Sequence, residues 1–330
     1  MLTRQALLFN LCLSALCASL PIRAAIAQTA SWPSKPVRII NNFPPGGPSD
    51  IIARALAESL AKSSGRSVIV ENKPGAGGNI GAADVAKAAG DGSTIFIGID
   101  TAFTVNPHIF PSMPFKLGNK AGDLKPLVII SSNGLLMGTS AAKGIRSMGE
   151  LIAQGKGAGL HFSSGGMGSP GHLGVAIFSQ AANIKITHVP YRGNSPAVLA
   201  MVSGEVDGGI LSSTGLLPQV KAGKVIPIAV TSRERSKAVP DVPTVGEIGY
   251  PGLENEVLTV AMVPGDTPDA LLAAMQKTAL EALQQAAMRE RMNTLDMRYE
   301  GLTGAAATKR LNDLSARYAK IVKATQMKAE

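Results

Sequence analysis

Short apolar runs alternate with helix-like segments along nearly the whole sequence, and this alternation restricts the chain to few folds. Apolar runs at 36–40, 67–72 and 94–99 are typical of buried parallel strands, and segments with helical spacing lie between them. Parallel strands need a crossover, usually a helix, between one strand and the next. The alternation therefore predicts an α/β fold.

A second set of apolar runs follows the first, and a further run with two long helices closes the chain. The expected strands of this part lie at 124–130, 159–164, 186–191, 206–211, 225–230 and 256–263. Two βαβ sets predict two lobes, and the lack of a linker suggests that more than one strand joins them, so that the C-terminal part returns to the first lobe. The predicted division is 32–124 plus 256–330 for lobe 1 and 125–255 for lobe 2.

The first residues indicate export. Residues 1–27 combine a basic start, the apolar run "ALLFNLCLSALCASL" and the small-residue site "AIA", which together predict a secretory signal peptide. Both cysteines, Cys12 and Cys17, lie in this segment, so the mature chain would have no thiol for a disulfide, a metal or catalysis. A lipoprotein interpretation of Cys17 fits poorly because Leu16 is not a small residue. No later run reaches the roughly 20 apolar residues of a membrane span.

The composition argues against a nucleic-acid-binding protein. The formal net charge is +9, but aromatic residues make up only 4% of the chain and do not alternate with the basic ones. A solvated basic surface that attracts small anions is the simpler interpretation.

Three glycine-rich turns stand out: "NNFPPGGPSD" at 41–50, "KPGAGGNIG" at 73–81 and "SSGGMGSPGH" at 163–172. In the first and third, a proline stands where a helix should begin, and Ser169 is the expected N-cap of the helix after the third. Each of these two turns follows a strand, and ligands bind at the carboxyl ends of strands in open α/β sheets. The turn at 73–81 either contacts ligand or only reverses the chain, and the sequence leaves both open.

The third turn has the spacing of a dinucleotide site, Gly166-x-Gly168-x-x-Gly171. Such a site needs an acidic residue about 20 positions later to hold the ribose. No Asp or Glu occurs anywhere from 151 to 204, so the dinucleotide interpretation fails. The same lack of acids favours an anion at the helix N-terminus, where free backbone N–H groups are expected.

Signatures of an enzyme are missing. The sequence has no Gly-x-Ser-x-Gly elbow and no His-Glu-x-x-His, and its histidines lack metal-like spacing, so we predict no catalytic residue, no metal site and no cofactor. Three side chains remain open between two roles. His172 either touches ligand or is structural, Asp207 either receives a ligand amine or hydroxyl or caps a turn, and Arg192 either pairs with a carboxylate or is solvated.

Several ordered motifs resemble one family. "WPSKPVRII", "FPPGGPSD", "VENKPGAGGNIGA", "SSGGMGSPGHL", "HVPYRGNSPA" and "PDVPTVGEIGYPG" resemble the substrate-binding proteins of tripartite tricarboxylate transporters, the Bug proteins. The resemblance implies a two-lobed, type II periplasmic binding protein-like α/β fold with a ligand cleft between the lobes. It also implies a monomeric periplasmic receptor that passes a small carboxylate to membrane transporter subunits or reports it to a sensor kinase. A secreted Ser/His hydrolase is the alternative from another class.

The resemblance also implies where the ligand lies. Lobe 1 would contact it through ordered water, and Asp50 in the first helix explains this because its negative charge disfavours direct anion binding. Lobe 2 would hold the carboxylate with backbone N–H groups and serine hydroxyls. The segment "ENEVLTVAMVPGDTP" lacks an aromatic residue common in the family, so we expect a bulkier or differently polar ligand. The predicted ligand-binding residues are Phe43, Gly46, Gly47, Thr101, Ser163, Ser164, Gly165, Gly168, Ser169, His172, Tyr191 and Asp207.

Overall fold

The computed structural model describes residues 32–328, so the predicted signal peptide lies outside the described residues. The strands are β1 (Val37–Asn41), β2 (Val68–Asn72), β3 (Thr94–Ile99), β4 (Leu124–Ser140), β5 (Leu160–Ser164), β6 (Ile186–Pro190), β7 (Gly208–Ser212), β8 (Val225–Val230), β9 (Glu256–Pro264) and β10 (Arg298–Leu302). The α-helices are α2 (Pro48–Ser64), α3 (Asn79–Ala86), α4 (Thr101–Thr104), α5 (Asn106–Ile109), α6 (Met148–Lys156), α7 (Pro170–Ala181), α8 (Asn194–Ser203), α9 (Ser213–Lys221), α10 (Asp269–Gln284), α11 (Ala286–Thr294) and α12 (Gly304–Thr325). Short 3₁₀ helices are η1 (Ala76–Gly78), η2 (Ala141–Lys143) and η3 (Pro251–Leu253).

The strands form one 10-stranded sheet with the order β2-β1-β3-β9-β4-β7-β5-β6, and β8 and β10 also pair with β4. Strands β1, β2 and β3 are parallel, and so are β5, β6 and β7. Each parallel set has helices between its strands, which confirms the predicted α/β fold class.

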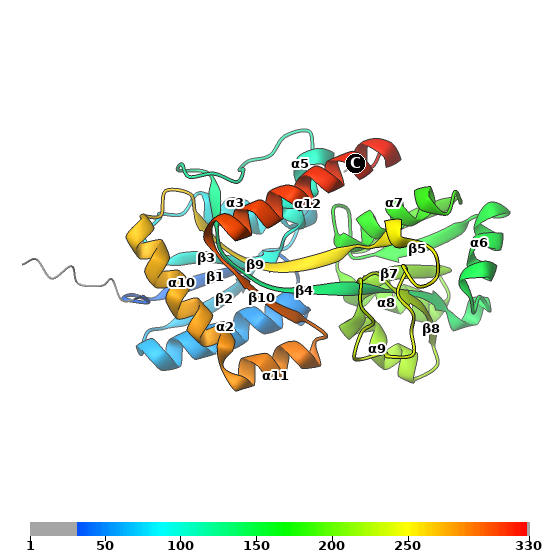
Figure 1. Cartoon of the computed structure of the whole chain (residues 1–330), viewed down its shortest axis with the longest axis horizontal. Coiled ribbons are helices and arrows are strands. Elements are labelled where there is room, and N and C mark those ends of the chain that lie inside the picture. The colour runs from blue at the N-terminus through cyan, green and yellow to red at the C-terminus, as the bar shows by residue number, and fades with distance from the viewer. Residues whose placement is uncertain (1–31, 329–330) are drawn as a thin grey trace, which may run out of the picture. The chain divides into compact units, whose positions relative to one another are not determined.

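The middle of the sheet differs from the prediction. The strand expected at 124–130 continues to Ser140, and β4 pairs antiparallel with β9 up to Gly134 and with β7 from Leu135 onward. The polar stretch "SSNG" ended the apolar run in the sequence, yet its backbone stays extended because β9 provides hydrogen-bond partners. Figure 1 shows β4 and β9 as long strands that run side by side.

The C-terminal part of the chain packs on the N-terminal part. Strand β9 pairs antiparallel with β3, and β10, which the sequence did not predict, pairs with β4. Helix α2 buries Ile52, Leu56 and Leu60 completely, and their spacing of four residues places them on one face of the helix. Each such side chain contributes roughly 1.5–3 kcal/mol relative to an exposed one. Among residues 32–328, no helix combines the length and the apolar character needed to cross a membrane.

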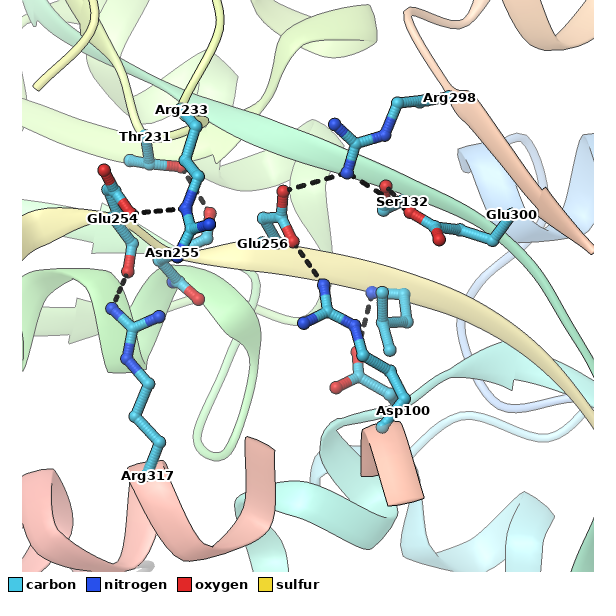
Figure 2. Close-up of polar contacts among 12 residues, drawn as sticks. Asp100, Ser132, Thr231, Arg233, Glu254, Asn255, Glu256, Arg298, Glu300 and Arg317 are labelled. Carbon is cyan, nitrogen blue, oxygen red and sulfur yellow. Dashed lines mark hydrogen bonds and ion pairs between the residues drawn. The ribbon is translucent and has the colours of Figure 1, made fainter. Parts of the chain in front are cut away.

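An ion-pair network surrounds the start of β9. Glu256 accepts hydrogen bonds from Arg310 Nη2 at 2.6 Å and from Arg298 Nη2 at 3.3 Å. Arg317 on α12 donates to the backbone oxygen of Glu254 at 2.6 Å, and Figure 2 shows these groups converging on β9. The network fixes the strand whose next residue, Val257, lines the cavity described below.

Candidate functional site

The N-termini of four helices meet around one cavity of about 320 Å³, here called the main cavity. Helices α2, α7, α8 and α9 each follow a strand of the parallel sets, β1, β5, β6 and β7. The carboxyl ends of these strands therefore face the cavity, as expected for a ligand site in an α/β sheet. Its lining consists of Phe43, Pro44, Pro45, Gly47, Pro48, Ser49, Ile99, Asn133, Leu135, Gly165, Ser169, Pro170, Gly171, Arg192, Gly193, Asn194, Ser195, Pro196, Ile210, Leu211, Ser212, Val257, Thr259 and Met297.

The electrostatics of the main cavity favour a negative ligand. Its described lining includes no Asp or Glu, and Arg192 is the one charged residue in it. A helix N-terminus stabilises a nearby anion by about 0.3–2 kcal/mol, because its first N–H groups have no partner within the helix. Helices α7, α8 and α9 carry no acidic residue in their first turns. The cavity is thus suited to bind a carboxylate or a similar anion.

The turn at 41–50, here called the α2 turn, is held by two asparagines. Asn41 Nδ2 donates to Ser49 Oγ at 3.1 Å and to the backbone oxygen of Ile97 at 2.8 Å. Asn42 Oδ1 accepts from the backbone N–H of Ile99 at 3.0 Å. These bonds tie the end of β1 to the end of β3, which places Phe43 and Ile99 together in the main cavity.

The acid of the α2 turn is already compensated. The Asp50 carboxylate is 2% exposed and accepts hydrogen bonds from Gly46 N–H at 2.9 Å, from Asn72 at 2.8 Å and from Arg54. Burial raises the pKa of this carboxyl, but the hydrogen bonds from Arg54, Gly46 and Asn72 outweigh it, so that the pKa lies below the ordinary 3.8. The carboxylate of Asp50 therefore already occupies the N-terminus of α2.

The turn at 163–172, here called the α7 turn, satisfies several of its own N–H groups. Gly166 N–H donates to Ser164 Oγ and Gly168 N–H to His172 Nδ1, both at 3.2 Å. Ser169 caps α7, because its Oγ accepts from His172 N–H at 3.3 Å. We expected the N–H groups of this turn to be free. This expectation is wrong for Gly166, Gly168 and His172.

Other amides at the main cavity stay available. The N–H groups of Gly165, Gly171 and Ser195 all line the cavity and donate to no acceptor among residues 32–328. Gly193, the N-cap of α8, has a φ angle of 118°, which residues other than glycine rarely adopt. A Cβ there would also lie 3.2 Å from Pro44 Cγ, so glycine allows the α2 turn and the start of α8 to approach closely.

The imidazole rings of His172 and His188 stack on each other next to the α7 turn. The rings of His172 and His188 lie 4.0 Å apart and are nearly parallel, with 7° between their planes. His188 Nε2 is 2.6 Å from Ser164 Oγ. Burial and the neighbouring His188 lower the pKa of His172 to about 3, and burial lowers the pKa of His188 to about 4. Both rings are therefore neutral near pH 7 and add no charge to the site.

A second cavity, of about 520 Å³, adjoins the main one and shares Phe43, Gly165, Ser169 and Arg192 with it. The turn at 73–81, whose role the sequence left open, contributes five residues, from Pro74 to Gly78, to this cavity.

The structure brings only part of the predicted site together. Phe43, Gly47, Gly165 and Ser169 line the main cavity, and Tyr191 lines the second one. The predicted residues that line neither cavity are Gly46, Thr101, Ser163, Ser164, Gly168, His172 and Asp207.

Physical reasons for these placements follow from their hydrogen bonds. Ser163 is fully buried, and its Oγ donates to the backbone oxygen of Ala197 at 3.2 Å. Asp207 precedes β7 and accepts from His161 N–H at 2.7 Å, at the amino ends of β7 and β5. It therefore lies at the opposite end of these strands from the main cavity. Thr101 is 3% exposed, and its Oγ1 has no hydrogen-bond partner among the described residues.

The other four residues form hydrogen bonds within or next to their own turns. Gly46 donates to Asp50, and Gly168 donates to His172. Ser164 bonds His188, and His172 lines a separate cavity together with His188. These positions shape the turns, whereas the cavity wall comes from their neighbours.

Several lining residues had no counterpart in the prediction. Ser195 and Pro196 repeat the polar-residue-then-proline pattern at the start of α8, so the motif "GNSPA" carried a usable signal. Leu135, Val257 and Met297 carried none, because an apolar residue in a strand or after a helix looks like any core position. In the described part of the chain, no three His, Cys, Asp or Glu side chains cluster in a way that could hold a metal ion.

The chain matches one protein family and is similar to several proteins of known sequence. Residues 52–327 match the model of the tripartite tricarboxylate transporter family receptor. The chain is similar to protein BugT of Bordetella pertussis, with 33% identity over 270 residues that cover 81% of this chain and 82% of BugT. It is equally similar to an uncharacterised-family protein of Pseudomonas sp. strain P51, with 33% identity over 82% of this chain and 80% of that protein.

Solved structures with the same architecture include a periplasmic binding protein. The periplasmic binding protein BugD superimposes with a TM-score of 0.81 at 26% identity, over 91% of this chain and 100% of BugD. An R. palustris protein solved with adipate gives 0.82 at 26% identity, covering 90% and 99% of the two chains. MatC from Rhodopseudomonas palustris with bound malate gives 0.80 at 26% identity, covering 88% and 100%. These similarities confirm the predicted two-lobed periplasmic binding protein-like fold.

Proposed function

The chain belongs to the tripartite tricarboxylate transporter family of receptors, and from this premise we propose that it captures a small carboxylate in the main cavity. The ligand would lie between the α2 turn on one side and the α7 turn with the start of α8 on the other. Two neighbours of the same fold were solved with the carboxylates adipate and malate, which supports this ligand class.

One observation carries the proposal: the N-termini of three helices without an acid in their first turns, α7, α8 and α9, and one arginine, Arg192, lie around a cavity whose described lining has no acid. Each hydrogen bond to a charged group contributes roughly 1.5–3 kcal/mol. Three such bonds, from the amides of Gly165, Gly171 and Ser195, would contribute roughly 4.5–9 kcal/mol, a range that includes the about 8 kcal/mol of a micromolar site.

Thermal unfolding with matched ligands tests the proposal. A ligand at 100 times its dissociation constant stabilises the native state by about 2.7 kcal/mol. We expect aliphatic, aromatic and dicarboxylic acids to include stabilising ligands, whereas hexylamine and neutral sugars leave the transition unchanged. If only amines or sugars raise the unfolding temperature, the ligand class is wrong.

We also propose the cellular context. Residues 1–27 would direct export, and the receptor would act in the periplasm, where it passes its ligand to membrane transporter subunits. The alternative role is a sensor whose liganded form docks on a membrane kinase. Pull-down with the transporter subunits, with and without ligand, separates the two roles, because a pure sensor would not bind them.

A hydrolase remains the second candidate because Ser164 Oγ and His188 Nε2 lie 2.6 Å apart, as in a nucleophile–base pair. Two features argue against it. Burial lowers the pKa of His188 to about 4, which makes it a weak base near pH 7, and Ser164 lines neither cavity. We therefore expect no product when the purified protein is incubated with carboxylic esters, and turnover would favour the hydrolase.

A further inference from the structure

The cationic and apolar parts of the main cavity lie on different walls. Arg192 and the residues that begin α8 and α7, among them Ser195 and Gly171, form one wall after β6 and β5. Helices α7 and α8 have no acid in their first turns. This wall, here called the donor wall, supplies free amides together with the one charged side chain.

The sheet itself lines another part of the main cavity, here called the floor. The pairs Ile99↔Thr259, Asn133↔Val257 and Leu135↔Ser212 are neighbours across four strands, and all six residues line the main cavity. Phe43 and Met297 also line the cavity. The floor therefore offers mainly aliphatic carbon, with the neutral polar groups of Asn133, Thr259 and Ser212.

The α2 turn is less favourable for a second negative charge than the donor wall, because it carries Asp50 in the first turn of its helix and no cationic residue of the turn lines the main cavity. Its N-terminal dipole already faces the Asp50 carboxylate, and Gly46 N–H is used by the same group. A second carboxylate on a ligand would lie over the floor or against this turn. It would lose water there without meeting a cation, and an unpaired charge in such surroundings is costly.

We infer that the ligand is a monocarboxylate with an apolar body, either aliphatic or aromatic. Its carboxylate lies at the donor wall and its body covers the floor. The inference rests on the proposed function, since it names the class of carboxylate for the same cavity. A volume of about 320 Å³ is at the lower end of the range for small-molecule pockets.

Matched pairs of acids test the inference by isothermal titration calorimetry on the purified protein. Hexanoate and adipate have the same carbon chain, but the far end is a methyl group in one and a carboxylate in the other; phenylacetate and 1,4-phenylenediacetate form the aromatic pair. We expect the monocarboxylate of at least one pair to bind at least tenfold more tightly than its dicarboxylate. If the dicarboxylate binds as well or better in both pairs, the inference is overturned while the carboxylate receptor stands. If none of the four acids binds, both proposals fail.

A floor variant makes the test independent of ligand choice. Asn133 is half-buried and lies beside Val257, so Asn133→Lys places a cation where the body of the ligand lies. We expect this change to raise the affinity for the dicarboxylate relative to its partner at least tenfold, whereas Asn133→Gln keeps the original preference. Circular dichroism and thermal unfolding without ligand check that both variants fold. An unchanged preference in a folded Asn133→Lys protein would overturn the assignment of the body to the floor.

Discussion

The α2 turn and the α7 turn share the same sequence features but differ in their electrostatics. Both place glycines before a proline at the first position of a helix, with Gly47–Pro48 in one and Ser169–Pro170 in the other. The α2 turn balances its helix N-terminus with the ionised, buried Asp50, which bonds Arg54. In the α7 turn, some of the backbone N–H groups donate to neutral acceptors, namely serine hydroxyls and the imidazole of His172. One turn therefore already carries an acid at its helix N-terminus, while the other carries none and still attracts a negative ligand.

The difference shows that a glycine-rich turn at a helix N-terminus does not by itself identify an anion site. The third residue of the helix decides whether the turn can bind an anion, because an acid at this position, such as Asp50, replaces the ligand. Each of the following experiments breaks or sharpens this contrast.

The largest effect is expected from Ser169→Asp, which gives the α7 turn the charge that the α2 turn already has. Aspartate is a good N-cap, so α7 should still form. The new carboxylate would face the main cavity, and we expect the affinity for hexanoate or the best-binding acid of the panel to fall at least hundredfold, about 2.7 kcal/mol. Isothermal titration measures the loss.

The matched control is Ser147→Asp. Ser147 is the N-cap of α6 and accepts from Glu150 N–H, but it lies outside both cavities. A similar loss of affinity in both variants would mean that charge at Ser169 acts from a distance and not at the site.

The two turns should also respond to different pH ranges. The folded pKa values of His172 and His188, about 3 and 4, lie below the ordinary 6.5, so the unfolded chain binds protons that the native α7 turn resists. Their contribution to stability is complete above about pH 6.5 and is lost as the pH falls toward 4. Between pH 7 and 5 we expect a loss of about 2 kcal/mol for one such imidazole, measured by urea unfolding.

Substitution separates this contribution from other titrating groups. The double variant His172→Gln/His188→Gln should flatten the pH dependence between 7 and 5. His161→Gln, at a side chain that is 61% exposed, should leave it as in the wild type. Equal slopes in the wild type and the double variant would contradict the role of the stacked pair.

The α2 turn should lose stability only at lower pH. Because the pKa of Asp50 lies below 3.8, its contribution is present above that value and disappears as the pH falls through the folded pKa. Asp50→Asn should therefore cost about 1 to 2 kcal/mol at pH 7 and progressively less as the pH falls below 3.8, as measured by urea unfolding. Asp313→Asn, which removes an exposed pair with Lys309, should cost less than about 0.5 kcal/mol at either pH.

The smallest effect is expected at Arg192, because this side chain is exposed and water screens its charge. Arg192→Gln should weaken binding of the same acid about threefold to tenfold, with a larger change at low salt. Arg146→Gln, at an exposed position outside both cavities, is the control. If the loss at Arg192 exceeded that of Ser169→Asp, the arginine and not the helix N-termini would dominate the site.

Local sequence signals predicted the parts of the site that depend on neighbouring residues. The helix starts at Pro48 and Pro170, the N-cap at Ser169 and the turns at the ends of β1 and β5 follow from short-range rules, and the structure has them where expected. The floor did not follow from such rules, because Leu135 and Val257 reach the cavity through the antiparallel pairing of β4 and β9. Nor did the occupancy of the Gly168 amide, since that depends on how His172 turns its ring.

The long strands β4 and β9 have a consequence for how such a receptor can change over time. β9 pairs with β3, β4 pairs with β7, and both strands supply residues to the floor. Any bending of one half of the sheet against the other must pass through the same segment that lines the main cavity. A mutation that adapts Val257 or Leu135 to a new nutrient would then also alter the mechanical joint, so selectivity and motion would have to evolve together.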